Sequence, residues 1–306
     1  MTDDIERPAI AVLGMGSMGR ALAQRLLAAH YEVCIWNRSP RDLSLLLDQG
    51  ALVLTSLGEV WNNADVAITF VANDDALGEV CLGASGILRS PVEGRLFVDM
   101  STVSPDISRD IAAAAEVSGI DYLRSPVSGN PFVLMSGNLT LIVSGARRAY
   151  DQYLELLNDI GPKVLYVGDG EHARLIKLAI NAGLAITTEL LAELVLLMER
   201  HGLDRSVLLD VLGESVLGSP FVKYKSANLL NRDYAATFTT ELLAKDLRLA
   251  LALAEEVNLT LPAVQLVSDL VEDAAIGYGD ADFAALLPHL QRRHGDEPDI
   301  PAIMDE

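Results

Sequence analysis

The stretch Ala9-Ile10-Ala11-Val12-Leu13-Gly14-Met15-Gly16-Ser17-Met18-Gly19 decides the fold of this 306-residue chain. An apolar run typical of a buried strand passes directly into three glycines, and the helix-forming residues 20–23 follow. In this context Gly14 permits a tight turn, Gly16 lets backbone approach a pyrophosphate, and Gly19 lets helix and strand pack closely. The stretch predicts a dinucleotide-binding loop made of Gly14, Met15, Gly16, Ser17, Met18 and Gly19, and a purely structural turn is the alternative.

Short apolar runs continue to alternate with helical patterns as far as residue 168. Such alternation is typical of βαβ units and of a mostly parallel, doubly wound sheet. We predict strands at residues 9–13, 32–36, 66–71, 96–100, 121–123, 139–143 and 164–167, and helices at 20–29 and 107–117. Residues 1–168 are therefore expected to form an α/β Rossmann domain that binds the cofactor.

The pattern changes after Gly168-Asp169-Gly170, where strand-like runs give way to long helical ones. The first of these covers residues 171–201 and predicts a helix of roughly 45 Å, at 1.5 Å per residue. Further helices are predicted at 204–211, 241–256 and 264–272. We therefore expect an all-α domain over residues 169–306, whose long first helix bridges domains or subunits.

Composition limits the partners and the compartment. Half of the residues are hydrophobic, and the formal net charge of −20 repels nucleic acid and anionic membrane surfaces. Cys34 and Cys81 have neither metal-site nor disulfide spacing, and no signal peptide or long uncharged apolar segment is recognised. We expect a cytoplasmic protein with no metal, no nucleic-acid partner and no membrane association.

The end of the second predicted strand bears on the choice of cofactor. An NAD site usually places an acid there for the ribose 2′-hydroxyl, but this chain has Asn37, Arg38 and Ser39. A cation beside a hydroxyl suits a 2′-phosphate, so the sequence favours NADP(H), with a solvated loop arginine as the alternative. Val71 ends one predicted strand and Thr102 follows another, both at the ligand-binding edge of the sheet, where we expect them to contact the cofactor.

Two polar residues stand out in the long predicted helix. Between residues 175 and 186 only Lys177 and Asn181 are neither apolar nor small, and their spacing of four places them on one helix face. Burial would lower the pKa of such a lysine and suit it to donate and accept a proton. A lysine whose stem packs while its head reaches solvent is an equally good interpretation of the pattern alone.

A turn over residues 125–131, Ser-Pro-Val-Ser-Gly-Asn-Pro, offers hydroxyl and amide donors at the end of a predicted strand. Ser128, Gly129 and Asn130 could hold a substrate carboxylate. Turns of this composition are also common without any ligand.

Taken in order, these motifs, together with Phe238 and Lys245-Asp246-Leu247, resemble the β-hydroxyacid dehydrogenases over nearly the whole chain. That family includes 3-hydroxyisobutyrate dehydrogenases and glyoxylate or succinic semialdehyde reductases, and its first domain is the NAD-binding domain type of 6-phosphogluconate dehydrogenase. The resemblance implies that Lys177 is the catalytic proton donor and acceptor with support from Asn181. It also implies that Ser128, Gly129 and Asn130 bind the substrate carboxylate and that Lys245 lies near cofactor and substrate. By the same resemblance, the helical domain of residues 169–306 serves substrate binding and dimerisation, and the protein is a homodimer.

Two departures leave the substrate open. The family often has glycine where Asn130 stands and asparagine where Ala182 stands. Imine reductases resemble the same family, but they usually carry aspartate or tyrosine at the position of Lys177. A small carbonyl or β-hydroxy acid is therefore the expected substrate and an imine the alternative. A non-catalytic NADP-sensing or dimerisation module is the interpretation from a different functional class.

Overall fold

The computed structural model describes residues 7–300, and the chain divides into two compact units between Lys177 and Leu178. Each unit has its own hydrophobic core. Residues 1–6, on which the expectation of no secretion signal rests, lie outside the described residues.

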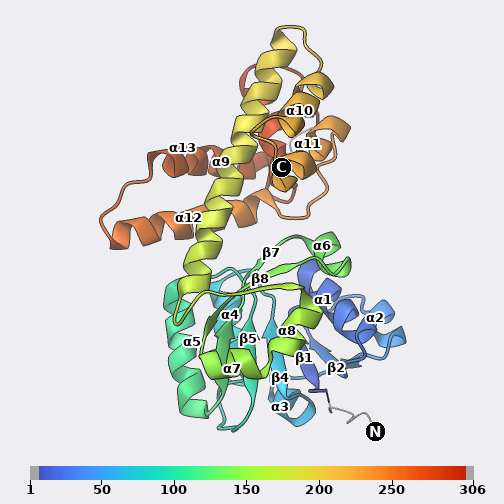
Figure 1. Ribbon diagram of the computed structural model, residues 1–306, viewed down its shortest axis with the longest axis vertical. Coiled ribbons are helices and arrows are strands. Elements are labelled where there is room, and N and C mark those ends of the chain that lie inside the picture. The colour runs from blue at the N-terminus through green and yellow to red at the C-terminus, as the bar shows by residue number, and fades with distance from the viewer. Residues whose placement is uncertain (1–6, 301–306) are drawn as a thin grey trace. The chain divides into compact units, whose positions relative to one another are not determined.

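The first unit is an α/β domain (Figure 1). Its strands are β1 (Ile10–Leu13), β2 (Val33–Trp36), β3 (Leu52–Val53), β4 (Val66–Thr69), β5 (Leu96–Asp99), β6 (Asp121–Arg124), β7 (Val127–Ser128), β8 (Thr140–Gly145) and β9 (Lys163–Tyr166). Its helices are α1 (Ser17–Ala28), α2 (Ser44–Asp48), α3 (Val60–Asn63), α4 (Asp74–Leu82), α5 (Pro105–Ser118), α6 (Pro131–Met135), α7 (Arg147–Gln152) and α8 (Leu154–Ile160), with the 3₁₀ turn η1 (Leu57–Glu59).

The strands pair in the order β3-β2-β1-β4-β5-β6-β8-β7, and β9 adds to β8. Pairing is parallel from β3 to β6, with Ile10 opposite both Val33 and Val66, whereas β8 runs antiparallel to β6 and β7. The order reverses direction between β1 and β4, which is the place where doubly wound sheets bind ligands. The predicted Rossmann fold with a mostly parallel sheet is confirmed.

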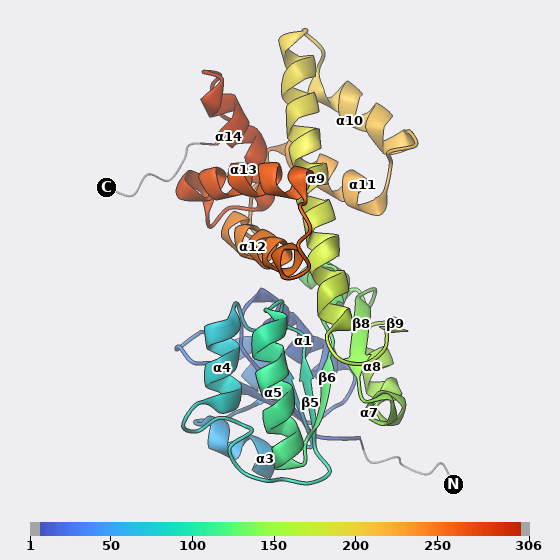
Figure 2. The same ribbon diagram turned by 90° about the vertical axis from the view of Figure 1, so that its left-hand side faces the viewer.

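Alternation along the strands builds a core on each face of the sheet. Ile10 and Val12 of β1 face one layer, which contains α1 and α8, while Ala11 and Leu13 face the other. Helices α4 and α5 pack together in this second layer, as Figure 2 shows. Burial on both faces explains why the central strands have near-continuous apolar sequences.

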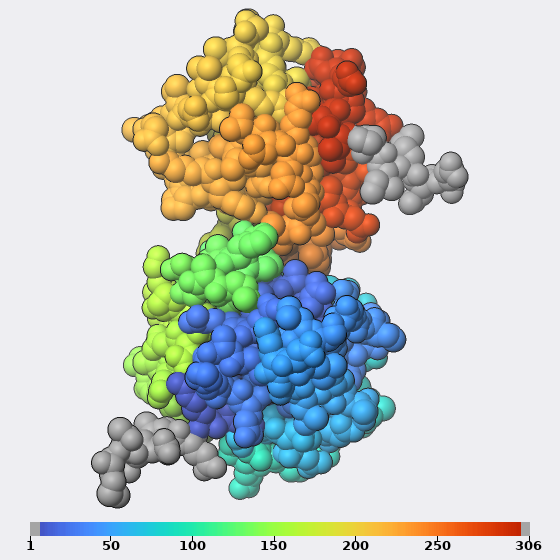
Figure 3. All heavy atoms as spheres, turned by 90° about the vertical axis from the view of Figure 1, so that its right-hand side faces the viewer, coloured from blue at the N-terminus to red at the C-terminus, as the bar shows by residue number. Residues whose placement is uncertain are grey.

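The structure adds short elements that the sequence did not predict. Strands β3 and β7 are two residues long, and helix α6 spans five residues and packs against α1. In Figure 3 the green atoms of this segment lie beside the blue atoms of the N-terminal part. These elements lack the length over which a periodic pattern can be recognised.

The second unit is helical. It contains most of α9 (His172–Arg200), followed by α10 (Arg205–Glu214), α11 (Pro220–Asn231), α12 (Thr240–Glu256), α13 (Pro262–Tyr278), the 3₁₀ turn η2 (Phe283–Ala285) and α14 (Leu286–Arg293). Helix α12 packs along α13, and the predicted all-α character is confirmed. The domain boundary at residues 168/169 remains a prediction, because the start of α9 is bonded to the first unit through Ala173 and Arg174.

Helix α9 is one continuous helix of 29 residues, close to the predicted range 171–201. Within the described chain it is also the one helix with the length and apolar character needed to cross a membrane. Half of its most apolar stretch is buried inside the protein. A core helix of a soluble protein has the same property.

Candidate active site

The glycine loop lies at the point where the strand order reverses. Gly14 has φ +101°, and a Cβ there would come within 2.3 Å of the Phe70 carbonyl oxygen in the loop after β4. A Cβ on Gly19 would lie 1.8 Å from the Gly14 carbonyl oxygen, whereas one on Gly16 would meet nothing within 4 Å. Gly14 and Gly19 are thus required for packing, and Gly16 leaves open space at the start of α1.

The N-terminus of α1 fits a phosphate group. Gly16 is its N-cap, no side chain caps the helix, and its first turn contains no acid. Unpaired N–H groups and the helix dipole both favour an anion at such a position. Residues 14–19 therefore fit the pyrophosphate of a dinucleotide.

Asn37 braces this loop from the end of β2. Its Oδ1 accepts a hydrogen bond of 2.8 Å from the Met15 N–H, and its Nδ2 donates to the Ser39 carbonyl at 2.7 Å. Arg38 and Ser39 are exposed beside it, and the Arg38 guanidinium lies 3.1 Å from the Glu79 carboxylate on α4. The predicted trio therefore divides into one bracing residue and two exposed polar residues, one of them a cation.

The loops after β4 and β5 are joined by a hydrogen bond. The Val71 N–H donates to the Ser101 hydroxyl at 3.0 Å, and the Ser101 N–H donates to the buried Asp99 carboxylate at 3.0 Å. Val71 and Thr102 are both half-buried at this edge of the sheet. They thus lie in linked loops on the ligand-binding side of the first unit.

The predicted carboxylate-binding residues surround the end of β7. Ser128 closes the strand, and Asn130 caps α6 by accepting a hydrogen bond of 3.0 Å from the Val133 N–H through Oδ1. The amide oxygen of Asn130 thus has a structural task, and its nitrogen is the atom suited to an anionic ligand.

Lys177 occupies the second turn of α9 and is half-buried. Its neighbours Leu175 and Ile176 are 41% and 39% exposed, so this turn of the helix is not buried on all sides. In the sequence, the half-buried Lys177 stands between the exposed Ile176 and the buried Leu178.

Asn181, one turn after Lys177, belongs to the second unit and is 1% exposed. Its Nδ2 donates a hydrogen bond of 2.5 Å to Asp246 of α12, and Lys245 lies 2.9 Å from the other oxygen of the same carboxylate. Because a carboxylate accepts hydrogen bonds, the amide nitrogen must face it. The Asn181 Oδ1 is left buried without a hydrogen-bond partner among residues 7–300. Asp246 thus fixes the amide and offsets the charge of Lys245, a role that the sequence did not reveal.

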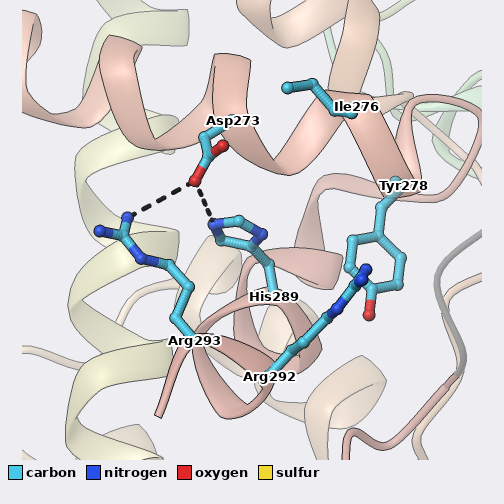
Figure 4. A pocket seen from close by; sticks show the side chains of 7 residues that line it. Asp273, Ile276, Tyr278, His289, Arg292 and Arg293 are labelled. Atoms are coloured by element: carbon cyan, nitrogen blue, oxygen red, sulfur yellow. Dashed lines mark ion pairs between the residues drawn. The ribbon is translucent and has the colours of Figure 1, made fainter. Parts of the chain in front are cut away.

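A separate cavity of about 530 Å³ lies in the second unit between α13 and α14 (Figure 4). Asp273 is 3.3 Å from His289 and 3.7 Å from Arg293, and its carboxylate offsets the charge of Arg293. Burial lowers the pKa of His289 despite the opposing effect of Asp273. None of the predicted site residues lines this cavity.

Family models match both parts of the chain. Residues 9–168 match the NAD-binding domain of 6-phosphogluconate dehydrogenase, and residues 168–290 match the NAD-binding region of NADP-dependent 3-hydroxyisobutyrate dehydrogenase. The chain belongs to the β-hydroxyacid dehydrogenase family. Like other members of this family, it is an NAD(P)-dependent oxidoreductase, and the second match supports the predicted cofactor NADP(H).

Curated relatives agree with this assignment. The chain is 32% identical over 281 residues to the oxidoreductase YfjR of Bacillus subtilis, covering 91% of this chain and 98% of that protein. It is 29% identical over 290 residues to glyoxylate/succinic semialdehyde reductase 2 of Arabidopsis thaliana, covering 94% and 81% of the two chains.

Solved structures share this fold. A 3-hydroxyisobutyrate dehydrogenase of Mycobacterium tuberculosis with L-serine aligns with a TM-score of 0.82 at 26% identity, covering 93% of this chain and 99% of that one. A reductive aminase of Aspergillus terreus with NADPH and ethyl levulinate aligns with a TM-score of 0.64 at 20% identity, covering 92% and 99%. The second likeness concerns the fold alone.

Proposed function

We propose that this β-hydroxyacid dehydrogenase is an NADP(H)-dependent enzyme that interconverts a small carboxylate-bearing carbonyl compound and its hydroxy acid, with Lys177 as proton donor and acceptor. The observation that carries the proposal is the pairing on α9 of a lysine with an asparagine one turn later, whose amide is held by Asp246. Helix spacing directs the two side chains to the same face.

The first unit supports the cofactor assignment. The α1 N-terminus and Gly16 would hold the pyrophosphate, Arg38 and Ser39 would receive the 2′-phosphate, and Val71 and Thr102 would flank the nicotinamide end. When bound, the nicotinamide would supply or accept the hydride. An exposed arginine is the only cation among residues 37–39, so the 2′-phosphate preference rests on Arg38.

The proton follows from the chemistry of Lys177. In reduction its ammonium group donates a proton to the carbonyl oxygen as negative charge develops there, and in oxidation its neutral amine takes the hydroxyl proton. The Asn181 Oδ1 can accept a hydrogen bond from the ammonium group or from a substrate hydroxyl, which satisfies a buried acceptor that otherwise lacks a partner. Asn181 therefore supports the proton transfer as an acceptor.

We propose Ser128, Gly129 and Asn130 as the carboxylate site, through a hydroxyl, a backbone N–H and an amide nitrogen. The relative from Arabidopsis thaliana is named for glyoxylate and succinic semialdehyde, and both compounds carry an aldehyde and a carboxylate. This support favours a substrate of the same class. A homodimer in the cytoplasm is the proposed state of the enzyme, and light scattering of the purified protein tests the dimer.

Imine reduction is the second candidate, favoured by the fold likeness to the reductive aminase. A protonated imine would be repelled by a lysine ammonium group, whereas a developing alkoxide is stabilised by it. Because residue 177 is a lysine, we rank carbonyl reduction before imine reduction.

One substrate panel tests the proposal. Glyoxylate, succinic semialdehyde and 3-hydroxyisobutyrate are compared with cyclic imines, using the wild type, Lys177→Ala and the exposed-lysine control Lys163→Ala. We expect Lys177→Ala to lower kcat about 100-fold with unchanged NADPH affinity, as for loss of a general acid. Near-normal turnover in Lys177→Ala, or faster turnover of imines than of carbonyls, would overturn the proposal. NADPH binding without turnover of either class would favour a sensing role.

A further inference from the structure

Four charged residues are buried together beneath the start of α9. Asp99 ends β5, Arg124 ends β6, Glu171 directly precedes α9 and Arg174 lies in its first turn. We call these four residues the α9 ion cluster. Their side chains are 0%, 7%, 11% and 1% exposed, respectively. Two cations and two carboxylates give the cluster a formal net charge of zero.

Arg174 is the centre of the cluster. Its guanidinium donates hydrogen bonds to the Asp99 carboxylate at 2.5 Å, to the Tyr122 hydroxyl at 2.7 Å and to the Ser101 carbonyl at 3.2 Å. Although burial opposes the charge, Tyr122 and Asp99 hold the pKa of Arg174 above its ordinary value. A single cation therefore joins α9 to β6 and to the loop after β5.

Arg124 and Glu171, the other two members of the cluster, lie beside the N-terminus of α9. The Arg124 guanidinium lies 2.5 Å from Glu171, and its Nε donates to the Ser108 hydroxyl at 3.1 Å. The Ser144 hydroxyl donates to the Gly170 carbonyl at 2.7 Å and accepts from the Ala173 N–H at 3.2 Å. The first turn of α9 is thus fixed to three strands of the sheet.

The same network reaches the loops assigned to the cofactor. The second oxygen of Asp99 accepts hydrogen bonds from the Thr69 hydroxyl at 2.6 Å and the Ser101 N–H, and the Ser101 hydroxyl accepts from the Val71 N–H. Val71 and Thr102 therefore have short chains of bonded groups that lead through Asp99 to Arg174. Lys177 follows Arg174 by three residues, less than one helical turn.

Stability alone is a poor reason for this arrangement. Buried ion pairs often stabilise a fold no better than apolar side chains of similar volume, because both charges must be desolvated. A guanidinium with three directed acceptors does, however, fix a helix in position and rotation better than apolar packing does. Catalysis is sensitive to that property, since a misplacement of about 1 Å can lower a rate roughly 100-fold.

We propose that the α9 ion cluster is a positioning device, which holds Lys177 in register with the loops after β4 and β5. Arg174 and Asp99 are its positioning residues and do not themselves touch substrate. The proposal rests on the proposed role of Lys177 in proton transfer.

A charge-balanced variant separates positioning from stability. Arg174→Met combined with Asp99→Asn removes one cation and one anion, leaving the Arg124–Glu171 pair intact. We expect this double variant to fold and to bind NADPH within about threefold of the wild type, but to lower kcat roughly 10- to 100-fold. The matched control is Arg205→Met with Asp299→Asn, which removes a buried arginine–aspartate pair 2.6 Å apart in the second unit and should retain kcat. Equal loss of kcat in test and control, or normal kcat in the test variant, overturns the proposal.

A double-mutant cycle tests whether the cluster acts through the lysine. Arg174→Lys keeps the charge but not the three directed bonds, so we expect it to lower kcat in the wild-type background and to have little further effect in Lys177→Ala. Additive losses would show that Arg174 acts independently of Lys177 and would overturn the positioning role. If Lys177→Ala itself retains activity, the proposed function fails instead, so the two failures are distinguishable.

Discussion

The amide nitrogen of Asn181 donates a hydrogen bond of 2.5 Å to Asp246, which lies 65 positions later in the chain. The bond orients the amide so that its oxygen faces away from the carboxylate. Asp246→Asn removes the charge and allows the Asn181 amide to flip, so that its oxygen and nitrogen exchange places. Because a hydrogen bond to a charged group contributes roughly 1.5 to 3 kcal/mol, we expect kcat to fall about 10- to 100-fold. Steady-state kinetics with the best carbonyl substrate measures the loss.

The control for this substitution is Asp210→Asn on the exposed face of α10. It should retain the wild-type kcat. A wild-type kcat in Asp246→Asn would show that the orientation of the Asn181 amide does not matter for turnover.

Gly16 and Gly19 should respond differently to the same added methyl group. Alanine at position 16 meets no atom within 4 Å, so Gly16→Ala should keep the thermal stability but weaken NADPH binding at least tenfold. Alanine at position 19 collides with the Gly14 carbonyl, and overpacking of this kind costs roughly 1–3 kcal/mol. Thermal unfolding and fluorescence titration with NADPH separate the two effects. Tight NADPH binding by Gly16→Ala would exclude the pyrophosphate from this position.

Because Arg38 pairs with Glu79, we predict that removing the Glu79 charge raises the affinity for NADPH. Both side chains are more than half exposed, so Glu79→Gln should leave the stability within about 0.5 kcal/mol of the wild type. It should also leave Arg38 available to a 2′-phosphate and tighten NADPH binding several-fold, while Arg38→Ala weakens NADPH far more than NADH. The comparison variant is Glu116→Gln at an exposed position of α5. Equal effects on both cofactors would refute the assignment of Arg38.

Glu189 lies in the part of α9 that belongs to the second unit. Its raised pKa predicts that the stability of the protein depends on pH. Burial, with help from Glu193, raises its pKa to about 7 from a value of 4.5. The folded state therefore favours the neutral acid. The contribution of Glu189 to the stability of the folded state is fully present below pH 4.5 and is lost as pH rises through about 7. The raised pKa corresponds to a loss of roughly 3 kcal/mol in the free energy of unfolding once the carboxyl group is ionised. Urea unfolding at about pH 5 and pH 8 should show this loss.

Glu189→Gln should remove most of that loss, because the amide does not ionise. The exposed substitution Glu255→Gln should keep it. The same loss of stability with pH in Glu189→Gln as in the wild type would assign the pH dependence to other groups.

The sequence predicted the parts of the fold that depend on local pattern. Strands such as β1 and the long helix α9 have apolar patterns that can be read locally, and the glycines 14, 16 and 19 after a strand predict a tight loop that leads into a helix. The pairing of β7 with β8, in contrast, depends on a partner strand, and two residues cannot show a period.

A candidate site residue can be proposed from sequence where a single side chain has unusual neighbours, as Lys177 does, and its role stays a prediction. Asp246 was missed, because an acid next to Lys245 in an amphipathic helix has the sequence of an exposed face. Arg174 was missed for a related reason, since its burial depends on Asp99 and Tyr122 from two distant strands. Contacts between residues far apart in sequence decide which charges are buried.

Asn37 constrains how the cofactor preference could be redesigned. The familiar route toward NADH is to install an acid at the end of the second strand. Aspartate at position 37 would still accept from the Met15 N–H, but it would set a carboxylate oxygen against the Ser39 carbonyl in place of the present N–H donor. Engineers and natural selection alike would have to rebuild the loop over residues 37–39 along with the charge, so a change of coenzyme is not reached by one substitution at this position.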